Sequence, residues 1–268
     1  MHVYYINLAH RTDRRAFMEG QFKKLGLEAT RVEAVTPDQI SPADLANHCD
    51  PRRIDWLTPP HLCCTLSHLE VMRLLLASPA PHALILEDDA VLSSRLPPLL
   101  DAFDATPPSL DVLRLETTQK WLRTKADGNP LAGIELARFV GWQGGTAAYI
   151  ITRHGAEVIL KHPRTKSRII DQLFFHSAGP LTHALKVRQS VPGLAIQVQS
   201  LPSADRPQRL PSDLNMAKFE RQQEAPYRFR HFLKRRWRAV HRDTVLAVHK
   251  AWFLYVEGAR KHQVAFLP

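Results

Sequence analysis

Residues 83–89 read Ala-Leu-Ile-Leu-Glu-Asp-Asp, an apolar run that ends abruptly in acidic residues. A continuous apolar run of this length is typical of a parallel strand that is covered on both faces. In open α/β sheets, ligands bind beyond the carboxyl ends of the strands. The stretch therefore predicts a central strand over 83–87 and puts Glu87, Asp88 and Asp89 where a ligand would bind.

The segments on either side alternate between strand-like and helix-like patterns. Strands are predicted over 3–8, 30–35, 111–116, 146–152 and 185–191. Helices are predicted over 13–25, 66–77, 96–103, 154–161 and 169–175. Residues 36–62 and 117–138 are predicted as irregular, the second as a mobile loop. The alternation indicates an α/β fold with a mostly parallel sheet flanked by helices.

The length of 268 residues suits one large domain with an extension. Prolines among polar residues mark 202–213 as a linker, so we predict a catalytic domain over 1–201 and a helical extension over 214–268. Three cysteines form an odd count without zinc-type spacing, which favours reduced thiols.

Most of the net charge of +10 belongs to the extension, because residues 218–262 hold twelve lysines and arginines against four acids. A uniformly basic nucleic-acid enzyme would look different, so no nucleic-acid partner is expected. The N-terminus lacks the pattern of a secretory signal, and no apolar run approaches the ~20 residues of a membrane span. We therefore expect a cytoplasmic protein, soluble or lying on a membrane surface.

The three adjacent acids at 87–89 repel one another unless a cation neutralises them. Hard oxygen ligands suit Mg²⁺ or Mn²⁺, and these ions commonly complete their shell with substrate phosphates. A metal there would offset charge on a departing nucleoside diphosphate. The alternative is a solvated turn.

A second polar segment, residues 7–15, follows the first strand and opens a helix, whose N-terminal amides favour anions. Arg11 and Arg14 could contact a phosphate or a base, and Asn7 would hydrogen-bond at the strand end. A solvated first helical turn is the alternative. No P-loop motif occurs, which argues against a P-loop NTPase.

Five segments together resemble the lipopolysaccharide glycosyltransferases of family 25 in order and spacing, from about residue 2 to residue 200. They are INLAHRTDRRAFMEGQFKKLG (6–26), TLSHLEVMRLLL (65–76), HALILEDDAVLS (82–93), GTAAYIITRHGAEVIL (145–160) and IIDQLFF (169–175). The resemblance implies a GT-A-type nucleotide-sugar fold, a divalent metal and an inverting transfer. The typical reaction moves galactose from UDP-galactose onto an oligosaccharide core.

By this resemblance, the Glu-Asp-Asp run matches the Asp-x-Asp element. Asp89 is then the expected metal ligand together with Glu87, while Glu87 and Asp88 would lie near the ribose, the diphosphate or metal-bound water. One departure is that Cys63 and Cys64 stand where the family usually has a Gly-Cys pair after an acid.

An inverting transfer needs a base that deprotonates the acceptor hydroxyl. Asp171 matches a family position and is the expected base, although it could instead cap its helix or hold the acceptor. Glu116, at the end of the strand 111–116, is the reserve candidate. Gly145 and Thr146 close a glycine-rich segment that allows close backbone approach and would shape the donor-sugar pocket.

The extension intersperses aromatic residues among seven arginines and lysines over 227–242. Helices over 228–242 and 244–261 would each show an apolar stripe and a basic face, as in helices that lie on anionic membranes. The acceptor implied by the family is lipid-linked, on the inner face of the cytoplasmic membrane. Packing of the extension on the catalytic domain, or nucleic-acid binding, are the alternatives.

Two other functions stay open from the sequence. One is a metal-dependent phosphoryl- or nucleotidyl-transfer enzyme that acts on nucleic acid. The other is a catalytically inactive carbohydrate-binding relative, against which the retained acids at 87–89 argue.

Overall fold

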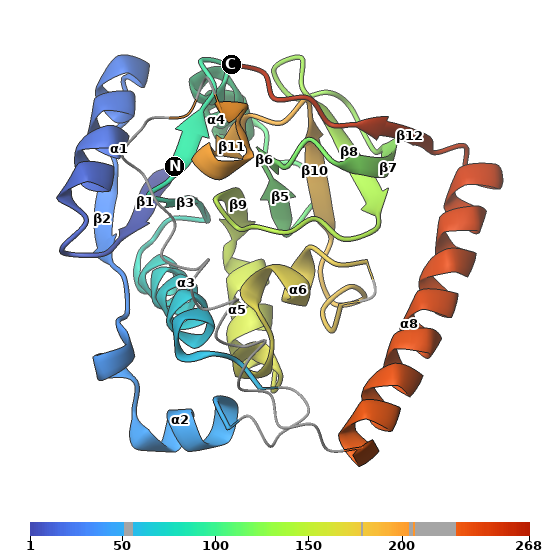
Figure 1. The fold of residues 1–268 in the computed structure, drawn as a ribbon. Helices are drawn as coiled ribbons and strands as arrows, with labels where there is room; N and C mark the ends of the chain where they lie inside the picture. Colours follow the sequence, from blue (N-terminus) through green and yellow to red (C-terminus); the bar gives the residue numbers. More distant parts are fainter. Residues whose placement is uncertain (51–55, 178, 204–205, 207–228) are drawn as a thin grey trace.

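The computed structural model describes residues 1–50, 56–177, 179–203, 206 and 229–268. One nine-stranded sheet forms its centre (Figure 1). Its strands, in sheet order, are β12 (Arg260–Gln263), β7 (Trp121–Ala126), β8 (Glu135–Val140), β10 (Val187–Val191), β5 (Val112–Arg114), β9 (Ala148–Thr152), β3 (His82–Glu87), β1 (His2–Asn7) and β2 (Thr30–Glu33). A small second sheet joins β4 (Ala90–Leu92), β11 (Ala195–Gln197) and β6 (Glu116–Thr117).

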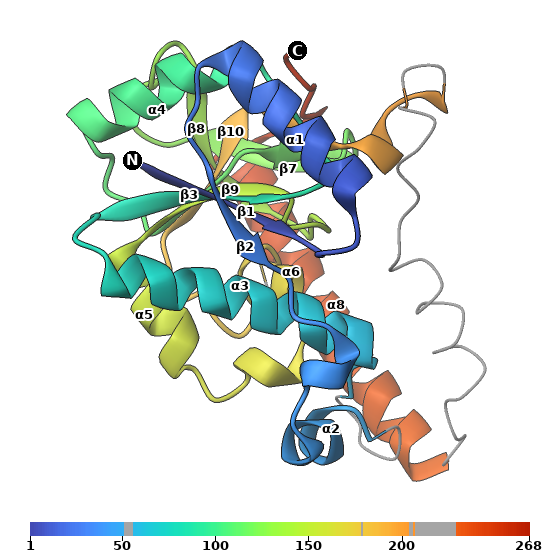
Figure 2. The same ribbon diagram turned by 90° about the vertical axis from the view of Figure 1, so that its left-hand side faces the viewer.

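Helices cover both faces of the large sheet (Figure 2). The helices of the described residues are α1 (Thr12–Leu25), α2 (Pro42–His48), α3 (Pro59–Ala77), α4 (Leu96–Ala105), α5 (Arg153–Lys161), α6 (Ile170–Phe174) and α8 (Phe229–Tyr255), with short 3-10 turns η1 (Pro37–Gln39), η2 (Thr165–Ser167) and η3 (Val198–Ser200). Of these, α2 lies away from the sheet (Figure 2). One core packs Met18 of α1 and Phe103 of α4 against the sheet, and the other packs Met72 of α3 and Ile159 of α5 against the opposite face. The predicted α/β class, with helices flanking one large sheet, is confirmed.

The sheet is mixed in direction. The pairings β1–β2, β1–β3 and β5–β10 are parallel, whereas the other five are antiparallel. Strand β9 lies between β3 and β5 and runs against both. The start of β9 therefore lies at the same edge of the sheet as the carboxyl ends of β3 and β5, which matters for the site.

Two segments predicted as irregular contain helices or strands in their described parts. Within 117–138, β7 begins an antiparallel ladder with β8, because alternation buries Leu122 and Thr124 on one face of the strand. Within 36–62, Ser41 caps α2 through the Asp44 amide, and α3 begins at Pro59, where a proline at the first helical turn loses no hydrogen bond.

The C-terminal extension differs from the two predicted helices. A single helix, α8, ends at Tyr255, Gly258 takes a left-handed φ of 70°, and β12 then pairs with β7 at the edge of the central sheet. The prediction of helix to residue 261 is therefore wrong, because the sheet edge offers backbone partners that a lone helix end lacks. The predicted linker 202–213 falls largely outside the described residues, and the domain boundaries stay a prediction. None of the helices in the described ranges is long and apolar enough to cross a membrane.

Candidate active site

Five carboxylates gather at one edge of the central sheet. One of them ends β3 and two follow it, a fourth begins β6 just after β5, and the fifth comes from α6. They are Glu87, Asp88, Asp89, Glu116 and Asp171. Because β9 starts at this same edge, Gly145 and Thr146 also reach the site. The structure thus brings together the acids that the sequence predicted on separate elements.

Glu87 is held by neutral donors and a histidine rather than left free. Its Oε1 accepts a hydrogen bond from Thr146 Oγ1 at 2.5 Å and lies 3.2 Å from His68 Nε2, while Gln197 Nε2 donates to Oε2 at 3.3 Å. Burial favours a raised pKa for Glu87, but the contacts with His68 and Thr146 lower its pKa on balance. Glu87 is therefore a charged anchor at the strand end.

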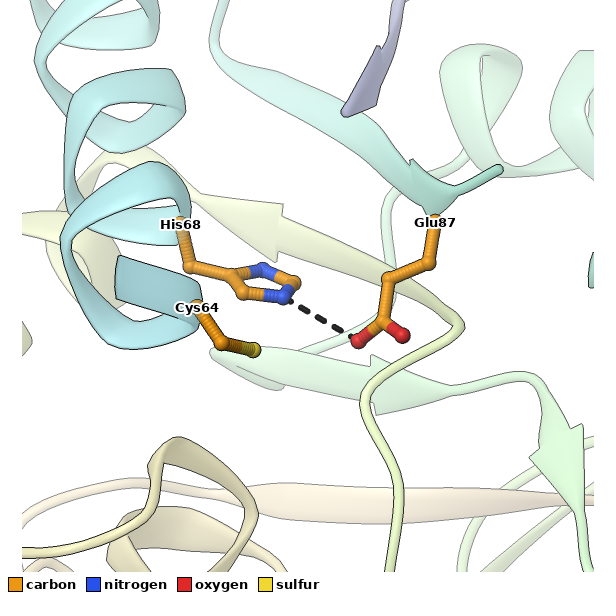
Figure 3. A group of neighbouring side chains, drawn as sticks. All are labelled: Cys64, His68 and Glu87. Atoms are coloured by element: carbon orange, nitrogen blue, oxygen red, sulfur yellow. Dashed lines mark hydrogen bonds and ion pairs between the residues drawn. The ribbon is translucent and has the colours of Figure 1, made fainter. Parts of the chain in front are cut away.

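Cys64 and His68 approach Glu87 from α3 (Figure 3). The three residues each offer a ligand atom, and these atoms all lie within 4.8 Å of one another. His68 Nδ1 meets the Tyr149 hydroxyl at 2.9 Å, an outer partner of the kind that orients metal-bound histidines. Burial, and then the nearby acids, raise the pKa of the Cys64 thiol well above its ordinary value. The group is thus a candidate metal site.

Asp88 is held by one residue of β1 and one residue of α1. Arg14 donates to Asp88 Oδ1 at 2.6 Å, and Asn7 Nδ2 donates to Oδ2 at 2.8 Å. Arg11 instead forms a two-pronged pair with Asp13, at 3.0 Å for each bond. The structure pairs Arg14 with Asp88 and Arg11 with Asp13, and both arginine side chains are buried. Their contact with a phosphate or base stays a prediction.

Asp89, Glu116 and Asp171 each keep a buried oxygen without a hydrogen-bond partner, namely Asp89 Oδ1, Glu116 Oε1 and Asp171 Oδ1. Burial, with added repulsion from Glu87, raises the pKa of Asp89 to about 7. Burial also raises the pKa of Glu116 to about 8, against the opposing charge of Arg114, and raises that of Asp171. Buried carboxylates that lack partners are costly, so a cation is the expected complement.

The loop before β9 is fastened to two of these acids. Gly145 N–H donates to Asp171 Oδ2 at 3.0 Å, and Ala147 N–H donates to Glu116 Oε2 at 2.9 Å. Gly145 has a φ of 93°, and an added Cβ there would clash with the Glu116 carboxylate. Arg114 is fully buried, lies 3.3 Å from Glu116 and donates to Gly144 O at 2.8 Å. Only glycine fits at position 145.

The residues present fit a divalent cation. Asp89 keeps a buried oxygen without a hydrogen-bond partner, and Glu87 lies at the end of the same strand with both of its oxygens hydrogen-bonded. The assignment of these two acids as metal ligands stays a prediction. The cluster of ligand atoms around Glu87 includes Cys64 and His68 but not Asp89.

Sequence reasoning did not place three contributors at the site, namely Cys64, Arg114, and His68, which it interpreted as a hydrogen-bonded core histidine. Cys64 and His68 lie four residues apart on one helix and so share a face, a spacing that could have indicated their joint role. Arg114 gave no signal, since a single arginine within a strand is ordinary until its burial beside Glu116 is seen.

Five carboxylates buried at one edge of a mixed sheet give this α/β protein an acidic site. Residues 1–174 match the profile of glycosyltransferase family 25 (LPS biosynthesis protein). This covers more than half of the chain and includes all five acids. The chain belongs to glycosyltransferase family 25.

The chain is also similar to individual proteins. The chain is 27% identical over 194 residues to a glycosyltransferase 25 family member of Anopheles gambiae, covering 64% of this chain but 30% of that protein. It is 26% identical over 207 residues to a putative glycosyltransferase of Haemophilus influenzae, covering 73% and 70%. Among solved structures, the inositol-1-phosphate CTP transferase from T. maritima aligns with a TM-score of 0.35 and 12% identity, covering 83% of this chain and 77% of that one.

Proposed function

We propose that the chain is an inverting glycosyltransferase that moves a sugar, with galactose from UDP-galactose as first candidate, onto a lipopolysaccharide or lipooligosaccharide core acceptor. One observation carries the proposal: Asp89, Glu116 and Asp171 each bury an oxygen without a partner, within the segments that match the family. Such a site is incomplete without a cation and a polar ligand.

Mn²⁺ or Mg²⁺ is the proposed cofactor, with Asp89 and Glu87 as its ligands. When bound, such an ion would stabilise the negative charge that develops on the departing nucleoside diphosphate. Asn7 and Arg14 hold Asp88, and so they fix the turn that presents Asp89.

Asp171 is the proposed base. The Gly145 amide holds Oδ2, while Oδ1 is buried without a partner and is free to accept a proton from an acceptor hydroxyl. Burial raises its pKa, which makes its carboxylate a stronger base. Glu116 suits the base role less well, because it is fully buried, paired with Arg114 and bonded to the β9 loop.

The proposed location is cytoplasmic, peripheral on the inner face of the membrane, where a lipid-linked acceptor would lie. Five large residues of α8, spaced three, eight, four and three positions apart, share one face and stand exposed: Trp237, Val240, Val248, Trp252 and Tyr255. An exposed apolar stripe on a basic helix supports attachment to an anionic membrane.

Hydrolysis and transfer assays with UDP-, GDP- and CMP-sugars, in the presence of Mn²⁺, test the proposal. Turnover of one UDP-sugar, lost in EDTA, is the expected outcome. Sugar binding without any turnover would favour the inactive carbohydrate-binding relative. Nucleotide transfer to a nucleic acid would favour the nucleotidyl-transfer alternative instead.

A further inference from the structure

A cleft of about 450 Å³ opens beside the acidic edge, a size typical of small-ligand pockets. The walls come from the β7–β8 ladder, α6 and its approach, and α8. The residues that matter here are Trp121, Arg123, Trp142, Arg168, Gln172 and Lys250. Part of this wall lies on α8, beyond the residues that match the family.

Three cations line this cleft without partners. The Nε atoms of Arg123 and Arg168 are buried and make no hydrogen bond. Within the described part of the chain, neither these guanidinium groups nor the Lys250 ammonium has an ion-pair partner; Asp243, which also lines the cleft, has contacts of its own. Buried donors without a partner are uncommon in folded proteins. Guanidinium groups bind carboxylate and phosphate through paired hydrogen bonds, so an anion is the expected ligand.

Two tryptophans give the cleft apolar faces. Trp121 is 63% exposed and Trp142 is 50% exposed, although both are large apolar side chains. An indole face offers a large rigid contact surface, which suits the C–H face of a pyranose ring. Cations beside exposed aromatic faces therefore describe a site for a sugar that carries negative charge.

The cleft is adjacent to the proposed base. Gln172 lines the cleft and follows Asp171 directly in α6. A Cβ placed on Gly144 would lie 3.5 Å from both Asp171 Oδ2 and the Trp142 indole. The Trp142 indole therefore lies near the Asp171 side chain, so a sugar held against Trp142 would lie beside the proposed base.

We infer that this cleft is the acceptor subsite, and that it takes a saccharide bearing a phosphate or carboxylate group. The inference rests on the proposed transferase function and adds the chemical class of its acceptor. Arg123, Arg168 and Lys250 would bind the charged group, while Trp142 would position the ring.

Binding to the full chain tests this inference without relying on turnover. Ligand-observed NMR would compare glucose, glucose 6-phosphate and glucuronate, with inorganic phosphate as a fourth probe. The variants are Arg123→Gln/Arg168→Gln and Trp142→Ala. Arg73→Gln is the matched control, since Arg73 is an exposed arginine paired with Glu70 on α3. Binding of UDP with Mn²⁺ reports whether the fold and the donor site survive each change.

The two charged sugars should bind at least about tenfold more tightly than glucose, and the double arginine variant should remove this preference while UDP binding persists. Preference for only one of the two would identify which charged group the acceptor carries. Equal binding of glucose and the charged sugars, or an unchanged preference in the double variant, would overturn the inference. Inorganic phosphate binding as tightly as glucose 6-phosphate, with no effect of Trp142→Ala, would also overturn it. If the unmodified chain binds the charged sugars but does not bind UDP, the result counts against the proposed donor and not against this cleft.

Discussion

At the scale of single residues, the active edge depends on carboxylates that the fold buries without complete partners. Arg14 is paired with Asp88, and Arg114 is paired with one oxygen of Glu116. Asp89 and Asp171 each retain an oxygen without a hydrogen-bond partner. Burial of this kind shifts pKa values and leaves acids ready to bind a cation or a proton. Three predictions follow from these side chains.

Replacing Asp171 with asparagine keeps the size of the side chain and its contact with the Gly145 amide but removes the base. Turnover should fall by roughly 10²-fold or more, with little change in the Kd of the donor. Steady-state rates and calorimetric titration would measure the two quantities. Asp101→Asn, at an exposed carboxyl on α4, is the control. Normal turnover in Asp171→Asn would show that Asp171 is not the base, and Glu116 would become the candidate.

Asp89→Asn tests the metal. Donor binding that depends on Mn²⁺ should disappear, because asparagine lacks the charge that attracts the ion. The melting temperature of the metal-free protein should not fall, since the exchange removes a buried charge with an unpartnered oxygen. Full activity of the unmodified protein in excess EDTA would contradict the metal proposal.

Glu116 should make stability depend on pH. Its pKa is about 8 in the folded protein, above the ordinary value of 4.5, so the folded state holds a proton that the unfolded state releases. The contribution of Glu116 to the free energy of unfolding is thus present below about pH 4.5 and is lost as the pH rises through about 8. Urea unfolding of the metal-free protein at pH 5 and pH 8 should show this fall, and Glu116→Gln should reduce it. An unchanged fall in that variant would assign it to other groups.

At the scale of elements, the C-terminal segment is both a part of the sheet and a carrier of an exposed stripe. β12 completes the β7 edge, Val264 is buried, and Gly193 exchanges backbone hydrogen bonds with Ala265 and Leu267 at 2.8 and 3.0 Å. Arg138 of β8 pairs with Glu257, and its guanidinium carbon lies 5.6 Å from the Phe253 ring centre. The end of the extension therefore packs on the catalytic body.

Deletion of residues 259–268 should lower the melting temperature by about 5–10 °C or more. In a chain of this size, each kcal/mol lost from the free energy of unfolding lowers the melting temperature by about 2–4 °C. Differential scanning calorimetry would measure it. Val256→Ser, at an exposed position just before the deletion, is a control that should change little. A melting temperature equal to that of the intact chain would show that β12 adds nothing to stability.

The outer face of α8 makes a different prediction. Trp237 and Tyr255 are 75% and 86% exposed, so Trp237→Ser/Tyr255→Ser should leave the melting temperature unchanged. Sedimentation with anionic phospholipid vesicles should nevertheless show weaker binding, because less apolar surface can enter the membrane interface. Leu74→Ser, which removes an exposed apolar side chain on α3, is the matched control. If Trp237→Ser/Tyr255→Ser binds the vesicles as strongly as the unmodified chain does, this face of α8 is not the membrane-binding surface.

At the scale of the whole molecule, the uneven placement of charge separates an acidic site from a basic C-terminal segment. Residues 218–262 hold twelve of the lysines and arginines and only four acids. Attraction of this segment to an anionic vesicle should weaken as salt rises, since screening shortens the Debye length from about 10 Å at 0.1 M to about 3 Å at 1 M. Co-sedimentation of the intact chain over that salt range would measure the effect. Binding equal for neutral and anionic vesicles at all salt concentrations would contradict the membrane proposal.

Much of the fold could be predicted because its signals are local. The apolar run 83–87, the helix ended by Gly26 and the alternating elements all depend on neighbours in the chain, and each lies close to its predicted place. The ladder formed by β7 and β8 escaped prediction, because residues 117–138 mix charges with short alternating runs. The end of α8 at Tyr255 also escaped prediction. The strand that follows it, β12, forms because it pairs with the open edge of β7, which lies far away in the sequence.

Local patterns in the chain were enough to predict the α/β class, the family, and the position of Glu87, Asp88 and Asp89 at a strand end. These properties follow from periodicity and from motif order, which need no knowledge of distant contacts. The contacts within the site became visible in three dimensions: Arg14 pairs with Asp88, Cys64 and His68 meet Glu87, and Asp171 accepts from the Gly145 amide. Such contacts join residues far apart in the chain, so they depend on strand order, register and packing.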